Sequence, residues 1–170
     1  FRPTGSDTAA NLYLSGSTIA FQSANGAGSI TGSTNLVANT WYHVAVVRAS
    51  GVTKLYLNGT QEGSNLTDTT DYGSTRPIKI GANLNGTAAF PGYIDELRVS
   101  TNARYTADFG TPSGIFQGDA NTVLLYHFDG AQGQTYLEEW SGEANWTKGH
   151  FFNNDVILAT KRSTNGSNSQ

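Results

Sequence analysis

Residues 54–63 read KLYLNGTQEG and contain the clearest structural signal in the chain. Polar and apolar side chains alternate over residues 54–57, which is typical of a strand with one buried face. Asn58-Gly59 follows, and this dipeptide favours a two-residue hairpin turn because both residues tolerate the positive φ that the turn requires. Residues 60–63 then provide the returning strand. The segment therefore predicts an antiparallel hairpin.

Strand-like patterns recur on both sides of this hairpin. Residues 12–22 predict a second hairpin, in which Ile19 and Phe21 face the core and Ala20 faces the opposite side. The apolar run at residues 41–47 predicts a central strand covered on both faces, with Trp41 in the core. Further candidate strands are residues 78–80, 93–99, 122–128 and 156–158, with loops at 64–75 and 110–122 and a short helical turn near 103–105.

These candidates amount to about nine short strands at a spacing of about ten residues, separated by turn residues. Such a pattern predicts an all-β fold, an antiparallel two-sheet jelly-roll sandwich. The 20 glycines and the low charged fraction of 14% agree with strands joined by many tight turns.

Composition also excludes several classes of protein. The net charge is −3 and the ten basic residues are scattered, so we expect no nucleic-acid partner. No run of 18 apolar residues occurs, so we expect no membrane insertion. The absence of cysteine excludes disulfides, thiolate metal sites and a thiol nucleophile. The chain begins with Phe1 and has no methionine, so we expect it to be a segment of something longer.

Five Asn-x-Ser/Thr sequons are candidate glycosylation sites in a secreted protein. Chance alone produces several sequons in a chain this rich in Asn, Thr and Gly, so the alternative is that they are unmodified. The five acceptor residues are Asn58, Asn65, Asn85, Asn145 and Asn165.

Four segments, in this order and at this spacing, resemble the laminin-G-like, concanavalin A-like jelly-roll family. They are residues 39–46 (NTWYHVAV), 52–60 (VTKLYLNGT), 78–81 (IKIG) and 92–100 (GYIDELRVS). The resemblance covers about residues 11–116 and implies the sandwich fold. Residues 103–109 (ARYTADF) and 122–130 (TVLLYHFDG) are similar to segments in the copies carried by phage and other virus structural proteins.

The resemblance implies a domain division. Residues 1–116 would form a laminin-G-like jelly roll that lacks its first strands, because only eleven residues precede Leu12. Residues 117–162 would either complete the sandwich or start a second unit, and residues 163–170 would be a polar tail. Three explanations for the missing strands remain open: truncation, completion by strands from residues 122–160, or donation of a strand by a neighbouring subunit.

Asp95-Glu96 is the only adjacent carboxylate pair on a predicted strand. Related jelly rolls that cleave β-glucans carry Glu-x-Asp-x-x-Glu on one strand, which places the acids on one face. The flanking acids are missing here, and Asp95 and Glu96 would point to opposite faces. We therefore expect no catalysis, and one carboxylate buried and bonded to backbone, Arg48 or Arg98.

No cofactor is required by this interpretation, but the resemblance allows calcium, whose oxygen ligands fit a chain without cysteine. Polar loops rich in Asp and Asn are equally typical of plain turns. His43 and His127 lie inside predicted strands and are expected to be satisfied core histidines. The candidate calcium ligands are, in the loops, Asp68, Asp71, Asn83 and Asn85, together with Asp95.

Aromatic side chains near loops are the remaining candidates for a binding site. Exposed rings can stack on sugars while Asn side chains bond the hydroxyls, although each ring could equally belong to the core. The candidate ligand-binding residues are Tyr72, Asn83, Asn85, Phe90 and Tyr93. Trp140 and Trp146 are candidate interface residues, because aromatic side chains are enriched at interface centres.

These observations favour a non-catalytic surface or structural module of a virus particle or extracellular assembly that mediates subunit contacts and adhesion. The alternative is a lectin-like module that recognises cell-surface glycans, and a glycoside hydrolase is a remote third. The expected partners are copies of the chain itself, other virion or surface proteins, or glycans. The expected location is extracellular or on the virion surface.

Overall fold

Where the structure describes the chain, the regular elements are short antiparallel β-strands. The computed structural model describes residues 10–24, 28–70, 72, 79–82 and 88–129. Within these ranges it contains eight strands and no α-helix: β1 (Asn11–Ser15), β2 (Thr18–Gln22), β3 (Ser29–Thr31), β4 (Val44–Ala49), β5 (Val52–Leu57), β6 (Thr60–Thr67), β7 (Leu97–Ser100) and β8 (Thr122–Tyr126). The predicted all-β antiparallel class is confirmed.

The strands fall into two compact units. Unit 1 comprises the described parts of Phe1–Arg76 and Asn102–Gly114, and unit 2 comprises those of Pro77–Thr101 and Ile115–Gln170. Strands β1 to β6 therefore belong to unit 1, and β7 and β8 to unit 2. None of the described residues forms a helix long and apolar enough to cross a membrane.

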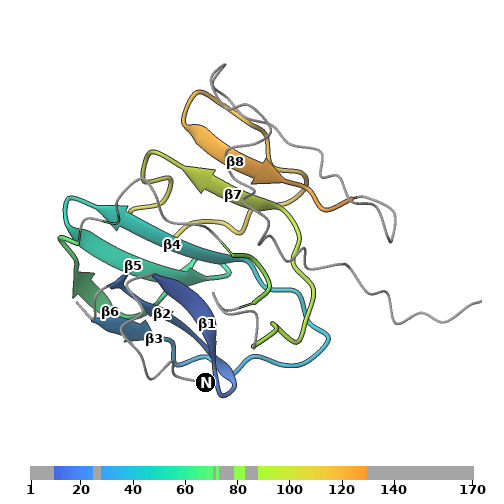
Figure 1. The fold of residues 1–170 in the computed structure, drawn as a ribbon, viewed down its shortest axis with the longest axis horizontal. Helices are drawn as coiled ribbons and strands as arrows, with labels where there is room; N and C mark the ends of the chain where they lie inside the picture. The colour runs from blue at the N-terminus through green and yellow to red at the C-terminus, as the bar shows by residue number, and fades with distance from the viewer. Residues whose placement is uncertain (1–9, 25–27, 71, 73–78, 83–87, 130–170) are drawn as a thin grey trace, which may run out of the picture. The chain divides into compact units, whose positions relative to one another are not determined.

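Both predicted hairpins of unit 1 are present. Ser15 pairs with Thr18 around a turn in which Gly16 has a φ of +63°. Leu57 pairs with Thr60 around Asn58 and Gly59, whose φ values are +49° and +83°. Positive φ at both central residues is the signature of the hairpin turn that Asn-Gly favours. Figure 1 shows the resulting sheets, ordered β1-β2-β3 and β4-β5-β6.

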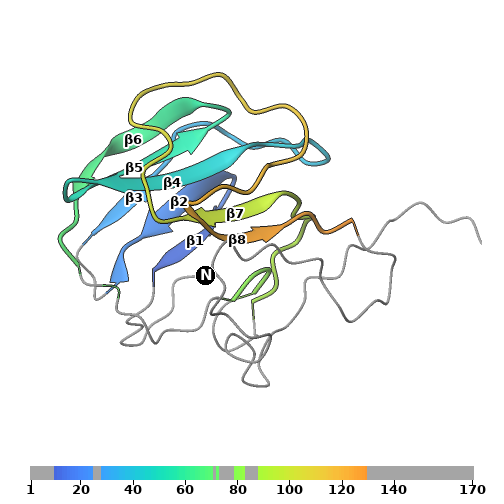
Figure 2. The ribbon, with the colours of Figure 1, turned by 90° about the horizontal axis from the view of Figure 1, so that it is seen from above.

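The core of unit 1 lies between these two sheets, which Figure 2 shows as two layers. Ile19 and Ile30 come from the first sheet, and Leu55 and Leu57 come from β5, the middle strand of the second. All four side chains are buried, and half-buried apolar residues surround them. Side chains alternate between the two faces of a strand, so Leu55 and Leu57 lie on the same face of β5. They are the buried residues that the second sheet contributes to this core.

The opposite face of β5 is covered by residues 102–114. The rings of Tyr105 and Phe109 stack with centroids 3.6 Å apart, and Phe109 also contacts the buried ring of Tyr56 edge-on. Phe109 donates its backbone N–H to the Gly59 carbonyl (2.9 Å), and Lys54 donates to the Thr106 carbonyl (2.8 Å). Figure 2 shows this segment on the side of the sheet away from β1–β3. The short helical turn predicted near residues 103–105 is wrong, because the backbone there is irregular, with a bend at Arg104 and no helical turn.

Unit 2 is built around the antiparallel pair β7 and β8. Leu97 pairs with Tyr126, and the pairing continues to Ser100 opposite Thr122. An isolated bridge joins Ala82 to Ala89, and Leu125 and Tyr126 are buried. The two strands are shorter than predicted, since residues 93–96 and 127–128 are not part of them.

Trp41 is a clear correction to the sequence analysis. This residue is 63% exposed, whereas a core position was predicted. Strand β4 begins only at Val44, so residues 41–43 belong to the preceding loop. Val44 and Val46 pack against the core in its place. Strand β4 also lies at an edge of its described sheet, whereas β5 is central.

Smaller differences concern individual positions. Ala20 is fully buried although it was expected on the face opposite the core, so β2 is covered at this point on both faces. Strand β6 extends to Thr67, into the predicted loop at residues 64–75. Residues 79–81 form no strand. The candidate strand at residues 156–158 and the polar tail lie outside the described residues.

Candidate functional site

The predicted site residues fall into three groups. Asp68 and Tyr72 lie together in unit 1, and Phe90, Tyr93 and Asp95 lie in unit 2. The third group lies outside the described residues: Asp71, Asn83, Asn85, Trp140, Asn145, Trp146 and Asn165. The candidate glycosylation residues Asn58 and Asn65 are described and are treated separately below.

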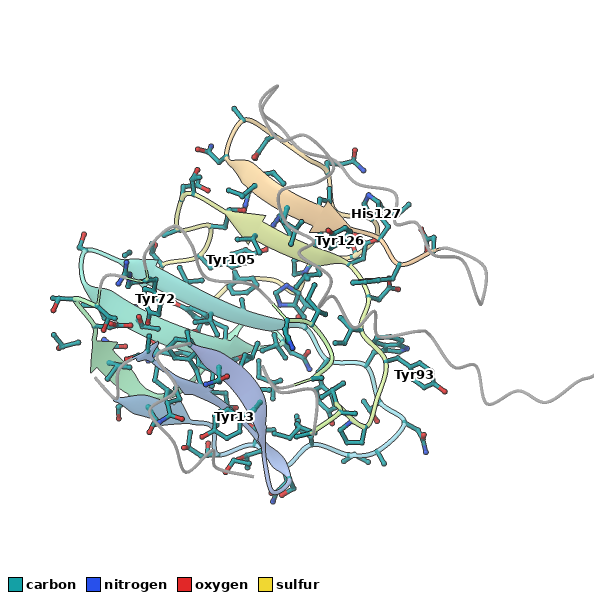
Figure 3. The ribbon with its side chains drawn as sticks, in the orientation of Figure 1. Tyr13, Tyr72, Tyr93, Tyr105, Tyr126 and His127 are labelled. Atoms are coloured by element: carbon teal, nitrogen blue, oxygen red, sulfur yellow. The ribbon has the colours of Figure 1, made fainter. Side chains whose placement is uncertain are left out.

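Asp68 and Tyr72 form a hydrogen-bonded cluster directly after β6. The Asp68 side chain is completely buried; it accepts the Tyr72 hydroxyl at 2.5 Å and the Thr70 backbone N–H at 3.0 Å. Thr53 on β5 donates a third bond, at 3.2 Å. The Arg48 guanidinium lies 3.9 Å from Asp68 and 4.8 Å from the centre of the Tyr72 ring. Figure 3 shows Tyr72 beside the β4–β6 sheet.

This network changes the acidity of both groups. Burial by itself raises the pKa of Asp68, but the hydrogen bonds from Tyr72, Thr70 and Thr53 together outweigh burial and hold the pKa below its usual value. Burial, together with the bond to Asp68 and its charge, raises the pKa of Tyr72 to about 12. Asp68 is therefore an ionised carboxylate whose oxygens already have protein partners, and Tyr72 is its neutral donor.

Calcium binding by Asp68 and Asp95 stays a prediction. The described part of the chain has no group of three His, Cys, Asp or Glu side chains arranged to hold a metal ion. Asp95 is in unit 2 and Asp68 in unit 1. Thermal melts with calcium and with a chelator would test the prediction, because an ion bound only by the native state raises the melting temperature.

Phe90 and Tyr93 are both 39% exposed and flank a short loop in unit 2. Phe90 donates its backbone N–H to the Gly81 carbonyl at 2.7 Å, next to the Ala82–Ala89 bridge. A Cβ at Gly92 would lie 2.8 Å from Cε1 of Phe90, so the ring folds over this glycine. The loop thus presents two partly exposed aromatic rings from an anchored backbone.

Glu96 bonds two segments that are distant in sequence. Its Oε2 accepts the Phe116 backbone N–H at 2.7 Å, and its Oε1 lies 2.9 Å from Nδ1 of His127. Its own backbone has a φ of +50°, a left-handed conformation that side-chain-bearing residues adopt rarely. Figure 3 shows His127 just beyond the end of β8. The Glu96 carboxylate therefore links Phe116, in the segment before β8, to His127, the residue directly after β8.

The loop between β3 and β4, residues 32–43, exposes two large apolar side chains. Val37 is 66% exposed and Trp41 is 63% exposed. Buried Glu62 holds the start of this loop, because its carboxylate accepts the backbone N–H groups of Ser33 (2.6 Å) and Thr34 (3.2 Å) and both of their hydroxyls. Burial raises the pKa of Glu62, but these four bonds outweigh it and leave the pKa below its usual value.

Two sequons lie on described strands or turns. The Asn58 side-chain oxygen accepts the His43 backbone N–H at 2.8 Å, and that of Asn65 accepts the Gln61 side-chain amide at 2.9 Å. Both residues are exposed. Glycosylation at these positions stays a prediction.

The antiparallel sheets of unit 1 and the segment that covers them agree with a match to a family model. The model, of the laminin-G type, describes the concanavalin A-like lectin/glucanases superfamily and matches residues 1–109. The chain belongs to this superfamily. Comparisons with curated proteins and with solved structures gave no match.

Membership in the concanavalin A-like superfamily confirms the predicted family and sandwich class. Because this superfamily comprises both lectins and glucanases, membership does not distinguish a binding protein from an enzyme. The positions of the acidic side chains bear on that question. Asp95 and Glu96 both precede β7 rather than lying on a strand, which corrects the prediction. Exposed Asp95 accepts the Glu96 backbone N–H at 3.0 Å. Glu96 is the bonded carboxylate that was expected, but its partners are Phe116 and His127, not Arg48 or Arg98.

The histidines of this concanavalin A-like chain are also placed differently from expectation. His43 precedes β4 and His127 follows β8, so neither lies within a strand. His43 is half-buried and contacts the rings of Tyr105 and Phe109 edge-on, at 6.0 and 5.6 Å. His127 is half-buried and pairs with Glu96.

Sequence reasoning missed Trp41 and Val37 as surface residues. The usable signal was Asn39, which adopts a φ of +59° between them. Asn is one of the few residues that favour this conformation, and it marks a turn where the apolar pattern alone indicates a continuous strand.

Proposed function

We propose that this chain is a non-catalytic surface module of a virus particle or an extracellular assembly, where it contacts copies of itself or other surface proteins and contributes to adhesion. The observation that carries the proposal is the exposure of large apolar side chains outside the core. They are Leu12, Val37 and Trp41 in unit 1, and Phe90, Tyr93 and Ile115 in unit 2. Apolar and aromatic side chains at a surface supply the binding energy of protein interfaces.

The environment of the acids supports a non-catalytic role. A retaining glycosidase needs two carboxyl groups about 5–5.5 Å apart that flank a sugar. Glu96 is engaged by the Phe116 N–H and by His127, and the described outer face of β5 is covered by Tyr105 and Phe109. We expect no release of reducing sugar from β-glucans. Measurable turnover that is abolished by Glu96→Gln would contradict this part of the proposal.

Strand β1 supports self-association. Within the described residues it pairs only with β2, so it lies at the edge of its sheet, and its Leu12 is 50% exposed. An edge strand can pair with a strand of another copy. The virus-particle setting rests on the similarity of residues 103–109 and 122–130 to virus structural proteins.

Light scattering over a concentration series tests this role. We expect the chain to associate, and Leu12→Lys to shift the population towards monomer because an edge lysine opposes strand pairing. Gln117→Lys adds the same charge at another exposed position and should leave association unchanged. A wild-type chain that stays monomeric at every concentration and binds no surface protein would overturn the proposal.

A lectin-like role is the second candidate, and Phe90 and Tyr93 favour it. Partly exposed rings can stack on sugar C–H faces. A glycan array with wild type, Phe90→Ala and Tyr93→Ala would test it. Tyr72 is the weaker candidate ligand residue, because its hydroxyl already bonds Asp68. Loss of glycan binding in both variants would support a lectin site in unit 2.

A further inference from the structure

We propose that Asn58 is a site of non-enzymatic covalent modification, where the side-chain amide converts to isoaspartate, and that docking of residues 102–114 on the turn between β5 and β6 controls the reaction. The modification acts as a one-way switch, because the product no longer accommodates the docked segment. The inference does not depend on the assembly or lectin-like role, and every group that it uses lies in unit 1.

The chemistry follows from the Asn58-Gly59 sequence. The Gly59 backbone nitrogen attacks Cγ of the Asn58 side chain, a C–N bond forms, and the amide nitrogen leaves with the Gly59 proton as ammonia. The product is a five-membered succinimide. Water added at Cγ breaks the new bond and gives aspartate, whereas water added at the Asn58 backbone carbonyl breaks the original peptide bond and gives isoaspartate. Glycine suits this attack because it has no Cβ beside the nitrogen.

The Asn58 side chain is exposed but held in a conformation that does not react. Its Oδ1 accepts the His43 backbone N–H at 2.8 Å, and its own backbone N–H donates to the His43 carbonyl at 2.8 Å. Its φ is +49°, and ψ in such a turn is about +30°. This ψ places the Gly59 nitrogen on the far side of the Cα–C bond from Cβ, whereas the ring needs both on the same side. Ring closure therefore requires the turn to open.

The attacking nitrogen is controlled by residues 102–114. Gly59 is buried, although Asn58 beside it is exposed. Its carbonyl accepts the Phe109 backbone N–H at 2.9 Å, and just after the turn Gln61 donates its backbone N–H to Asp108 at 3.0 Å. The docked segment thus fixes the turn at two places, so the turn can rotate only after the segment has left it.

Isoaspartate at position 58 is incompatible with the docked segment. Its backbone runs through Cβ and Cγ, which inserts one additional atom before the Gly59 nitrogen and displaces Gly59. No space is left for such a displacement, since a Cβ at Gly59 would lie 1.9 Å from the Phe109 carbonyl oxygen. Docking therefore suppresses conversion, and conversion prevents docking. Aspartate adds no backbone atom and keeps an oxygen for the His43 N–H, so it leaves the segment docked.

Conversion would change the surface of unit 1. Figure 2 shows residues 102–114 on the side of the β4–β6 sheet away from β1–β3. Release of this segment frees the stacked rings of Tyr105 and Phe109 and uncovers Tyr56 on β5, which is fully buried in the docked state. The switch thus replaces a covered sheet face by an aromatic one.

The first test measures conversion at residue 58 in the full chain. Asn25→Gln, Asn85→Gln and Asn165→Gln remove the other Asn-Gly pairs from every sample. The chain is incubated at mildly alkaline pH, with and without urea, and isoaspartate is quantified by peptide mapping with mass spectrometry. We expect conversion in urea to be at least about tenfold faster than in the native chain, because native conversion requires local opening. Equal rates would overturn the inference.

Two variants loosen the docked segment. Phe109→Ala should raise the native rate at least about fivefold, because the aromatic contacts that favour the closed turn are lost. Asp108→Ala removes only the bond to Gln61 and should raise the rate by less, so the test does not depend on one variant that could fail to fold. Wild-type rates in both variants would contradict control by the segment.

Ile30→Val is the matched control. It weakens the core of unit 1 away from the turn, so the native rate should stay close to that of wild type. An acceleration as large as that in Phe109→Ala would show that conversion follows global unfolding, and the inference would fail.

Hydrogen exchange tests the switch itself. In chains that carry isoaspartate at position 58, the Phe109 amide should lose its protection against exchange. Asn58→Asp represents the other product and should keep this protection within about twofold. Unchanged protection in the isoaspartate chains would overturn the switch. None of these results bears on association in Leu12→Lys, so the assembly role stands or falls separately.

Discussion

Two acidic side chains of unit 1, Glu62 and Asp68, are buried next to hydroxyl and backbone donors. Glu62 accepts four bonds from Ser33 and Thr34, and Asp68 accepts bonds from Thr53, Thr70 and Tyr72. A buried carboxylate without such donors would be strongly unfavourable, so each carboxylate fixes the position of the loop that satisfies it. For Glu62 that loop is the one that carries Trp41.

Replacing Glu62 by Gln tests this link between a buried residue and a surface loop. The amide would turn an NH₂ donor towards the donors of Ser33 and Thr34, so we expect the free energy of unfolding to fall by about 1–3 kcal/mol. Urea denaturation measures it. Asp95→Asn, at an exposed carboxylate, should change it by less than about 0.5 kcal/mol. Equal effects of the two changes would show that Glu62 does not hold the loop.

The exposed position of Trp41 predicts that its removal has little effect on stability. The core position suggested by the sequence would predict a large loss of stability. Trp41→Ala should change the free energy of unfolding by about 0.5 kcal/mol or less, because the ring leaves no core cavity. Leu55→Ala should lower it by about 2–5 kcal/mol, since Leu55 is fully buried at the centre of the core. If Trp41→Ala is as destabilising as Leu55→Ala, the loop before β4 is wrongly placed.

Among the elements, the hairpin β5–β6 combines a local turn with a distant contact. Asn58 and Gly59 adopt the positive φ values that their sequence predicts. Glycine is required at position 59 for a second reason besides its positive φ, because a Cβ there would lie 1.9 Å from the Phe109 carbonyl oxygen. At this turn, therefore, residues 102–114 pack directly against the sheet, and no side chain larger than that of glycine fits.

Gly59→Ala should be much more destabilising than Gly16→Ala. Both glycines have positive φ, so alanine brings backbone strain of about 1 kcal/mol at each site. At Gly16 no atom lies within 4 Å of the new Cβ, whereas at Gly59 the Phe109 backbone must move. Chemical denaturation of both variants checks the order. Equal losses would mean that residues 102–114 do not pack on this turn.

Sequence patterns predicted some elements better than others for a physical reason. Hairpins β1–β2 and β5–β6 follow from alternation and from turn residues, both of which act over a few residues. The predicted start of β4 was wrong by three residues, because a run of apolar residues does not indicate where pairing with the neighbouring strand begins. Pairing begins where β5 provides a partner, at Val44 opposite Leu57.

For the whole molecule, the buried carboxylates predict loss of stability in acid. The pKa values of Glu62 and Asp68 lie below their ordinary values of 4.5 and 3.8 in the folded chain. The unfolded chain therefore takes up protons first as the pH falls. Their contribution is fully present above about pH 4.5 and is lost as the pH falls through the folded pKa values.

Thermal melts between pH 7 and pH 2 measure this dependence. We expect the melting temperature to fall below about pH 4.5, and the fall to be shallower in Glu62→Gln, which removes one of the two groups. A melting temperature that does not change over this range would show that neither carboxylate is held in the way described.

The amino-acid sequence by itself determined the all-β class, the two hairpins of unit 1 and the superfamily, because strand alternation and turn chemistry are local properties. Only the tertiary structure decided which side chains are buried and which acids are satisfied. Glu62 meets Ser33 and Thr34, and Glu96 meets Phe116 and His127, across 20 or more residues of chain. Such partners are set by sheet pairing and by the return of connecting segments, which also leave Trp41 at the surface.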